Sequence, residues 1–79
     1  MVAFAPPPSQ NNRRRAVELY DEADHWACIA RYCDVLARAF PKERDRYRLN
    51  AVVAQIHARE RRHEARRLCP EPLVVRIAT

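Results

Sequence analysis

Residues 16–41 read AVELYDEADHWACIARYCDVLARAFP, and apolar side chains recur every seven positions along them. Two interleaved series of this kind form the seam by which one helix packs against another. One series consists of alanines and the other mostly of larger residues: Ala16, Ala23, Ala30 and Ala37, with Leu19, Trp26, Cys33 and Phe40. The pattern predicts a long amphipathic helix.

The helix breakers of the chain set the bounds of this helix and of a second one. Glycine is absent, and between Pro8 and Pro70 the only proline is Pro41. Proline is tolerated in the first turn of a helix but not in its interior. We therefore expect one helix over residues 13–39 and another over residues 41–68.

The predicted fold class is all-α, an antiparallel two-helix hairpin over residues 13–69. Asn11 or Asn12 is expected to cap the first helix. The run of prolines predicts a flexible leader over residues 1–12. The β-branched composition of the closing LVVRIAT predicts an extended tail over residues 70–79.

Further apolar stripes on the two helices indicate further packing. On the first helix, a second stripe lies about a third of the way round from the seam: Cys28, Tyr32, Val35 and Ala39. Two stripes on one helix call for two neighbours. On the second helix, four aliphatic residues form the expected core stripe: Leu49, Val52, Val53 and Ile56.

Dimerisation follows from this count of neighbours. The chain has 79 residues, and a core of that size is marginal by itself. Because the chain supplies only two helices, we expect two copies to form a four-helix bundle. The predicted interface anchors lie on the first helix: Leu19, Trp26, Ile29, Tyr32, Val35 and Leu36.

The net charge of +5 comes almost entirely from arginine, because fourteen arginines accompany a single lysine, Lys42. The planar guanidinium group makes bidentate contacts with phosphate or carboxylate, so the bias indicates an acidic partner. Five arginines of the second helix fall within roughly 60° of one another: Arg44, Arg48, Arg59, Arg62 and Arg66.

Most of these five arginines lack an acidic neighbour at the spacing where helical charge pairs form. Only Arg48 has one, Asp45, three residues away. A solvated face normally intersperses both signs of charge. A row of like charges therefore suggests binding of an external polyanion, with plain solvated surface as the alternative.

A second basic cluster, Arg13, Arg14 and Arg15, stands where the first helix is expected to begin. The helix dipole disfavours cations at that end. In an antiparallel hairpin this triplet lies beside Arg62 and Arg66, so the two clusters are predicted to merge into one basic end.

Nucleic acid is the expected partner, with duplex RNA favoured over DNA. The chain has no glycine turn of helix-turn-helix type, no zinc-finger spacing and no aromatic pair on strands, so backbone recognition is expected rather than base reading. The layout and charge are similar to those of small virus-encoded suppressors of RNA silencing. That resemblance implies a dimeric helical regulator that lies on duplex RNA. It covers layout and charge alone, and no functional residue is carried over from it.

The alternative hypothesis is a protein-interaction module. An exposed apolar stripe of the hairpin would bind an acidic or helical partner protein, and the arginines would form the polar rim.

The remaining side chains predict neither catalysis nor a metal or cofactor site. Cys28, Cys33 and Cys69 are odd in number and unsuited to a disulfide framework. The cysteines and histidines do not converge on a four-ligand set. Two helices also offer no preformed pocket for catalysis.

The chain contains no apolar run of about 20 residues and no signal peptide, so we expect neither membrane insertion nor secretion. The expected compartment is reducing, the cytoplasm or the nucleus.

Overall fold

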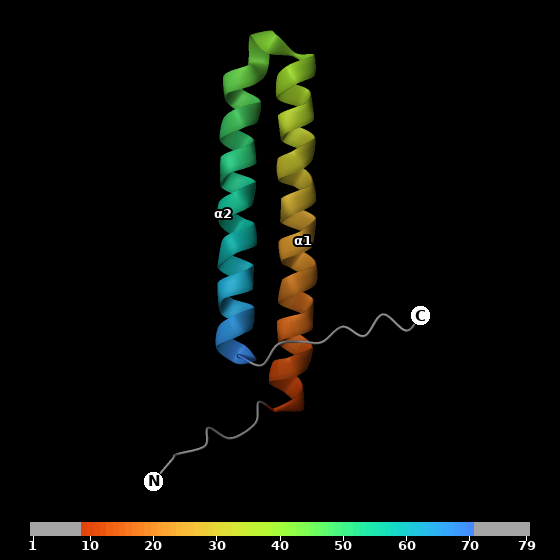
Figure 1. Cartoon of the computed structure of the whole chain (residues 1–79), viewed down its shortest axis with the longest axis vertical. Coiled ribbons are helices and arrows are strands. Elements are labelled where there is room, and N and C mark those ends of the chain that lie inside the picture. The colour runs from red at the N-terminus through yellow and green to blue at the C-terminus, as the bar shows by residue number, and fades with distance from the viewer. Residues whose placement is uncertain (1–8, 71–79) are drawn as a thin grey trace, which may run out of the picture.

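A computed structural model describes residues 9–70 as two long antiparallel helices joined by one tight turn (Figure 1). The first helix, α1, spans Gln10–Ala39, and the second, α2, spans Arg44–Leu68. The helical hairpin expected from the sequence is confirmed. Most of the predicted leader and tail, at residues 1–8 and 71–79, lies outside the described residues.

Helix α1 begins three residues earlier than expected. Ser9 has extended backbone angles, and its Oγ accepts a hydrogen bond from the backbone N–H of Asn12 at 3.1 Å. The prediction that Asn11 or Asn12 caps the helix is therefore wrong. Serine is an equally good N-cap residue, and it directly follows the last proline of the leader.

Pro41 separates the two helices, as its position predicts. Phe40 adopts φ −123° and ψ 77°, because a following proline disfavours helical geometry. Its backbone N–H still donates to the carbonyl of Leu36 at 2.8 Å, which closes α1. Residues Pro41–Glu43 then form a short 3₁₀ helix, η1, before α2 starts. The helix expected over residues 41–68 is thus divided in two.

The interface between the helices is made almost entirely of small residues. The alanine series of α1 is buried, as predicted, and it packs against a matching series on α2. We call this interface the alanine seam; its buried members are Ala16, Leu19, Ala23, Ala30, Cys33, Ala37, Ala51, Ala54, Ala58, Ala65 and Cys69.

The predicted core stripe of α2 is wrong. Leu49, Val52, Val53 and Ile56 are exposed by 64%, 51%, 44% and 47%. Ala51, Ala58 and Ala65, spaced by seven residues on another side of α2, face α1 instead. Small residues on both helices match and let the two helices approach closely.

A seam of alanines gives the hairpin little hydrophobic stabilisation. Each buried methyl or methylene group contributes about 0.8 kcal/mol, so an alanine contributes far less than a leucine. The largest aliphatic side chain in the seam is Leu19. It packs with Ala16, Ala65 and Cys69 at the open end of the hairpin. Most large aliphatic side chains of residues 9–70 thus remain outside the core.

Candidate nucleic-acid interface

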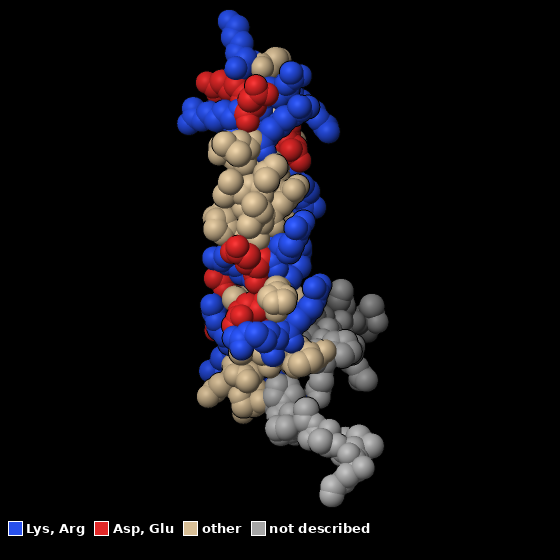
Figure 2. Space-filling model, turned by 90° about the vertical axis from the view of Figure 1, so that its left-hand side faces the viewer, with Lys and Arg blue, Asp and Glu red and all other residues tan. Residues whose placement is uncertain are grey.

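The five arginines predicted to act together lie along one side of α2. We call Arg44, Arg48, Arg59, Arg62 and Arg66 the arginine row. Two adjoining open grooves between α1 and α2 contain the whole row. Arg44 and Arg48 line the groove near the turn, and the other three line a groove of about 890 Å³ nearer the open end. Figure 2, which shows the α2 side of the molecule, has basic side chains along one edge of that helix.

No arginine of the row makes an ion pair within residues 9–70. This includes Arg48, although Asp45 lies three residues away. Arg46 and Glu43, which are also three residues apart, form no salt bridge with each other in this part of the chain. The row is therefore a series of charges that the described hairpin does not neutralise through salt bridges.

The other arginines of α2 do have partners. Arg67 donates from Nε to Oε2 of Glu64 at 2.9 Å and forms a second hydrogen bond from Nη2 to Oε1 of the same carboxylate. This hydrogen bonding lowers the pKa of Glu64 and raises the pKa of Arg67. Arg61 also lies three residues from Glu64 but makes no salt bridge with it. Its Nη1 lies 3.7 Å from Glu60 instead and donates to Nδ1 of His57 at 3.2 Å.

Helix α1 adds two arginines to these grooves that the pattern of α2 alone could not reveal. Arg38 lines the groove near the turn, and Arg31 lines the other. They lie seven residues apart and so share one side of α1. This spacing identifies them as groove residues once it is known which side of α1 borders the groove.

Acidic side chains also border the row. Asp24 lines the groove near the open end, and Asp34 lines both grooves. Neither forms a salt bridge with the row in residues 9–70. Seven arginines and two aspartates line the two grooves together, so the lining remains basic.

The triplet Arg13, Arg14 and Arg15 lines neither of the two grooves that contain the row. The antiparallel arrangement does bring the start of α1 beside the end of α2, as expected. Consecutive residues of a helix, however, point about 100° apart, so three in succession cannot share a side. The three side chains therefore cannot all lie on the side of the hairpin that carries the row, and the merging of the two clusters into one basic end stays a prediction.

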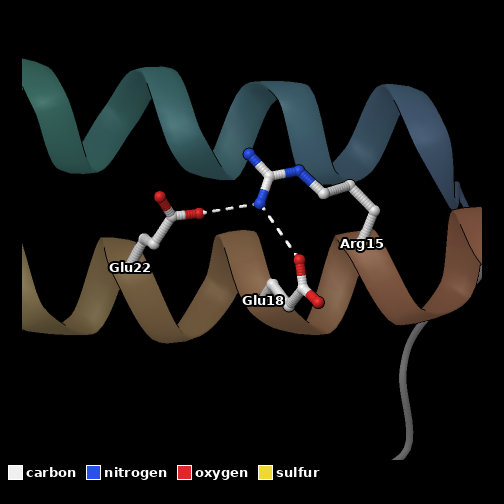
Figure 3. Close-up of polar contacts among 3 residues, drawn as sticks. All are labelled: Arg15, Glu18 and Glu22. Atoms are coloured by element: carbon white, nitrogen blue, oxygen red, sulfur yellow. Dashed lines mark hydrogen bonds and ion pairs between the residues drawn. The ribbon is translucent and has the colours of Figure 1, made fainter.

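Arg15 in particular is already engaged. Its Nη1 lies 3.1 Å from Oε2 of Glu18 and 3.2 Å from Oε2 of Glu22, so one guanidinium group bridges two carboxylates of the same helix (Figure 3). The engagement of Arg15 is not part of the sequence prediction, which compares only the α2 arginines with their acidic neighbours. Glu18, three residues away, was the available signal.

On the other side of the hairpin, aromatic and basic side chains bridge the helices. The rings of Trp26 and His57 stack with centroids 4.4 Å apart. The guanidinium carbon of Arg61 lies 5.9 Å from the centroid of the Trp26 ring, within the range of a cation–π contact. Trp26, predicted as a dimer anchor, therefore contacts helix α2 of its own chain.

The other predicted dimer anchors divide by exposure. Leu19 is only 4% exposed within a single chain, so it leaves almost no surface for a second chain to cover. Ile29 and Leu36 are half-buried. Tyr32 and Val35 are exposed by 65% and 57%.

Among residues 9–70, no three His, Cys, Asp or Glu side chains are grouped so that they could hold a metal ion. Cys28 is exposed, whereas Cys33 and Cys69 are buried. In the same part of the chain, neither helix has the length and apolar character needed to cross a membrane.

Comparison with protein-family models, curated proteins and solved structures finds no match to this chain.

Proposed function

We propose that this protein binds the phosphate backbone of a nucleic-acid duplex, with duplex RNA preferred, as a non-catalytic homodimer in the cytoplasm or nucleus. The observation that supports this most is the arginine row, whose five charges have no ion pair within residues 9–70. Like charges spaced along one side of a helix destabilise it. Binding of a polyanion would relieve that repulsion.

The length and shape of the row suit a duplex. From Arg44 to Arg66 the helix advances about 33 Å at 1.5 Å per residue, close to one turn of a DNA duplex. Each phosphate that an arginine neutralises releases counterions and so contributes to affinity. A straight helix can therefore place several such contacts along a single groove edge.

The preference for RNA rests on the kind of contact that the row can make. Arginines that follow a backbone contact phosphates and carry no sequence information. Duplex RNA is recognised mainly through its shape, its phosphates and its 2′-hydroxyl groups. A regulator of the silencing-suppressor type would need such recognition, because it must bind RNA duplexes of any sequence.

The test compares two triple variants that lose the same charge. The row variant carries Arg48→Gln, Arg62→Gln and Arg66→Gln. Arg59 is kept because it also borders the exposed aliphatic residues of α2. The control variant carries Arg15→Gln, Arg61→Gln and Arg67→Gln, three arginines that already contact acidic side chains. Binding to duplex RNA, duplex DNA and single strands is measured by fluorescence anisotropy at several salt concentrations.

We expect the row variant to lose affinity for all duplex sequences alike. The slope of log affinity against log salt should shrink by roughly one unit per phosphate contact removed. The control variant should change much less. Equal losses in both variants would show that net charge alone drives binding. Absence of salt-dependent binding by the unmodified protein would refute the proposal.

A protein-interaction module is the second candidate, and one observation favours it. Four aliphatic residues of α2 are 44–64% exposed, and such a stripe could bind a helical or acidic partner protein with the arginines at its rim. Failure of duplex binding, with a specific partner captured through these residues, would favour this function instead.

A further inference from the structure

The exposed aliphatic residues of α2 form one continuous surface. We call Leu49, Val52, Val53 and Ile56 the aliphatic patch. Its members lie within two helical turns of one another and are each about half exposed. Figure 2 shows an uncharged area on α2 at this level, between two bands of charged side chains. Contiguous apolar surface on the order of a few hundred Å² marks an interaction site more often than plain surface.

We propose that the aliphatic patch is where a second copy of this chain docks, with the two α2 helices antiparallel. This inference rests on the proposed function in that it names the surface joining the two copies of the duplex-binding dimer. The occupant is argued from the symmetry of the patch, from the charges that flank it and from the position of the arginine row.

The spacing of apolar residues in the patch is the same in both directions along α2. Leu49 and Ile56 are equally distant from the midpoint between Val52 and Val53. A two-fold dimer requires a self-complementary surface, because each copy presents the same residues to the other. With the axis at this midpoint, leucine meets isoleucine and valine meets valine, so every large apolar side chain faces another.

The charges on either side of the patch are complementary under the same symmetry. In a view down the axis of α2, Glu60 lies about 30° and Arg46 about 70° from the centre of the patch on one side. On the other side, Asp45 lies about 30° and Arg59 about 70° from the centre. The two-fold axis is perpendicular to both helices, so the second α2 runs in the opposite direction. Residues on one edge of the contact therefore lie next to residues of the same edge in the second copy.

Each arginine beside the patch therefore meets an acid of the second copy. Arg46 approaches Glu60 of the second copy, and Asp45 approaches Arg59 of the second copy. The symmetry gives each pair twice. Asp45 and Glu60 of opposite copies stand at the same level, but on opposite edges of the contact, which keeps these like charges farther apart than the unlike ones.

These flanking residues are available for such pairing. Within residues 9–70, Asp45, Arg46 and Arg59 make no ion pair. Glu60 has only longer contacts, 3.7 Å to Arg61 and 3.9 Å to His57.

Docking through the patch has a consequence for the arginine row. The row lies about 100° round α2 from the patch, on the side of Asp45 and Arg59. The two-fold axis therefore places both rows on the same face of the dimer, on neighbouring α2 helices about 8–10 Å apart. In this dimer Arg59 of each copy pairs with Asp45, and the other four arginines of the two antiparallel rows form one continuous basic face.

The outer side of α1, the interface expected from the sequence, is the competing surface. It exposes two large apolar side chains, Tyr32 and Val35, in the corresponding stripe, where the patch exposes four. Docking there would also separate the two rows by two α1 helices, roughly 24–30 Å at 8–10 Å per helix spacing. The patch buries more aliphatic surface and brings the rows together.

The first test measures the mass of the full chain by sedimentation and light scattering at micromolar concentration. We expect the unmodified protein to be a dimer and Val52→Lys to be a monomer with unchanged helical circular dichroism. Val35→Lys adds the same charge to the outer side of α1 and should leave the dimer intact. A dimeric Val52→Lys variant, or a monomeric unmodified protein, would overturn the inference.

The second test exchanges the charges of one flanking pair. Arg46 and Glu60 lie about 21 Å apart along the same helix, so only contact between copies couples them. Arg46→Glu and Glu60→Arg should each weaken the dimer by roughly tenfold or more, because each changes two symmetric pairs. The double variant keeps the net charge and should restore most of the affinity. A double variant as weak as the single ones would contradict the antiparallel arrangement.

The same samples separate this inference from the proposed function. If the unmodified protein is a dimer and Val52→Lys a monomer, but neither binds a duplex in a salt-dependent way, the inference about the patch is supported and the nucleic-acid proposal fails. If the unmodified protein binds duplex RNA through the row while Val52→Lys remains a dimer, the function stands and the patch is not the interface.

Discussion

The indole ring of Trp26 stacks on the imidazole ring of His57 with the ring planes inclined by 27°, and this contact joins α1 to α2 on the side away from the arginine row. It supplies one of the few large side chains that bridge the helices between the turn and Leu19. Aromatic pairs contribute about 0.5–1.5 kcal/mol beyond the area they bury. The contact therefore compensates in part for the small residues of the alanine seam.

Replacing Trp26 with Ala is expected to lower the free energy of unfolding by about 2–3 kcal/mol, because it removes half-buried aromatic surface and the partner of His57. Urea unfolding followed by circular dichroism measures this change. Tyr32→Ala, an exposed aromatic on the same helix, is the control and should change stability little. Equal effects would show that the stacking contributes nothing of its own.

Overpacking the alanine seam should be costly. Ala58 is 2% exposed where it faces α1, so Ala58→Leu forces the helices apart and should destabilise the hairpin by about 1–3 kcal/mol. Ala39→Leu, at an exposed position of α1, should be nearly neutral. A stabilised Ala58→Leu variant would mean that the helices pack through other residues.

The bond between Arg67 and Glu64 predicts a pH dependence. Because Arg67 lowers the pKa of Glu64 below its ordinary value of 4.5, the ionised carboxylate favours the folded state. Its contribution is complete above that value and is lost as the pH falls through the lower, folded-state pKa. The difference in urea midpoint between the unmodified protein and Glu64→Gln should thus be constant near neutral pH and shrink in acid. A difference that grows in acid would contradict the sign.

The three cysteines should differ in reactivity. Cys28 is exposed, whereas Cys33 and Cys69 are 8% and 2% exposed. Under native conditions, alkylation followed by mass spectrometry should add a single group at Cys28. The other two thiols should react at comparable rates only in denaturant. Fast native labelling of Cys33 would show that the seam opens more readily than its burial implies.

Thermal stability should depend on protein concentration if two copies associate through the aliphatic patch. Association stabilises only the folded state, so the melting temperature rises with concentration. For Val52→Lys it should stay constant over the same range. Calorimetry at concentrations differing by about tenfold measures both, and a constant melting temperature for the unmodified protein would argue against association.

The sequence predicted the hairpin well because its signals are strong and local. Pro41 alone divides the helices, and the alanine series from Ala16 to Ala37 marks the buried side of α1. The buried side of α2 does not follow from side-chain size, because its buried residues are alanines and its large aliphatic residues are exposed. The heptad of Ala51, Ala58 and Ala65 was the better guide, since it matches the alanine spacing of α1.

Only the part of the candidate site that lies on a single helix was predictable from the sequence. The side of α2 that carries the arginine row follows from helical geometry. The partners of Arg61 depend on rotamers and on Trp26 across the interface, which spacing cannot reveal. The presence of Asp34 and Arg38 in the same grooves depends on how α1 is rotated against α2. That rotation follows from the packing of both helices together.

The single tight turn at Pro41 also sets the order in which the hairpin assembles. Contacts next to the turn join residues close in sequence, whereas Leu19 meets Ala65 across a loop of more than forty residues. Short loops close at a lower entropic cost than long ones, so the helices should zip together from the turn toward the open end. Helical proteins rich in local contacts fold within microseconds to milliseconds. The far end, where α1 begins and α2 ends, is then the last part to dock and the first to open.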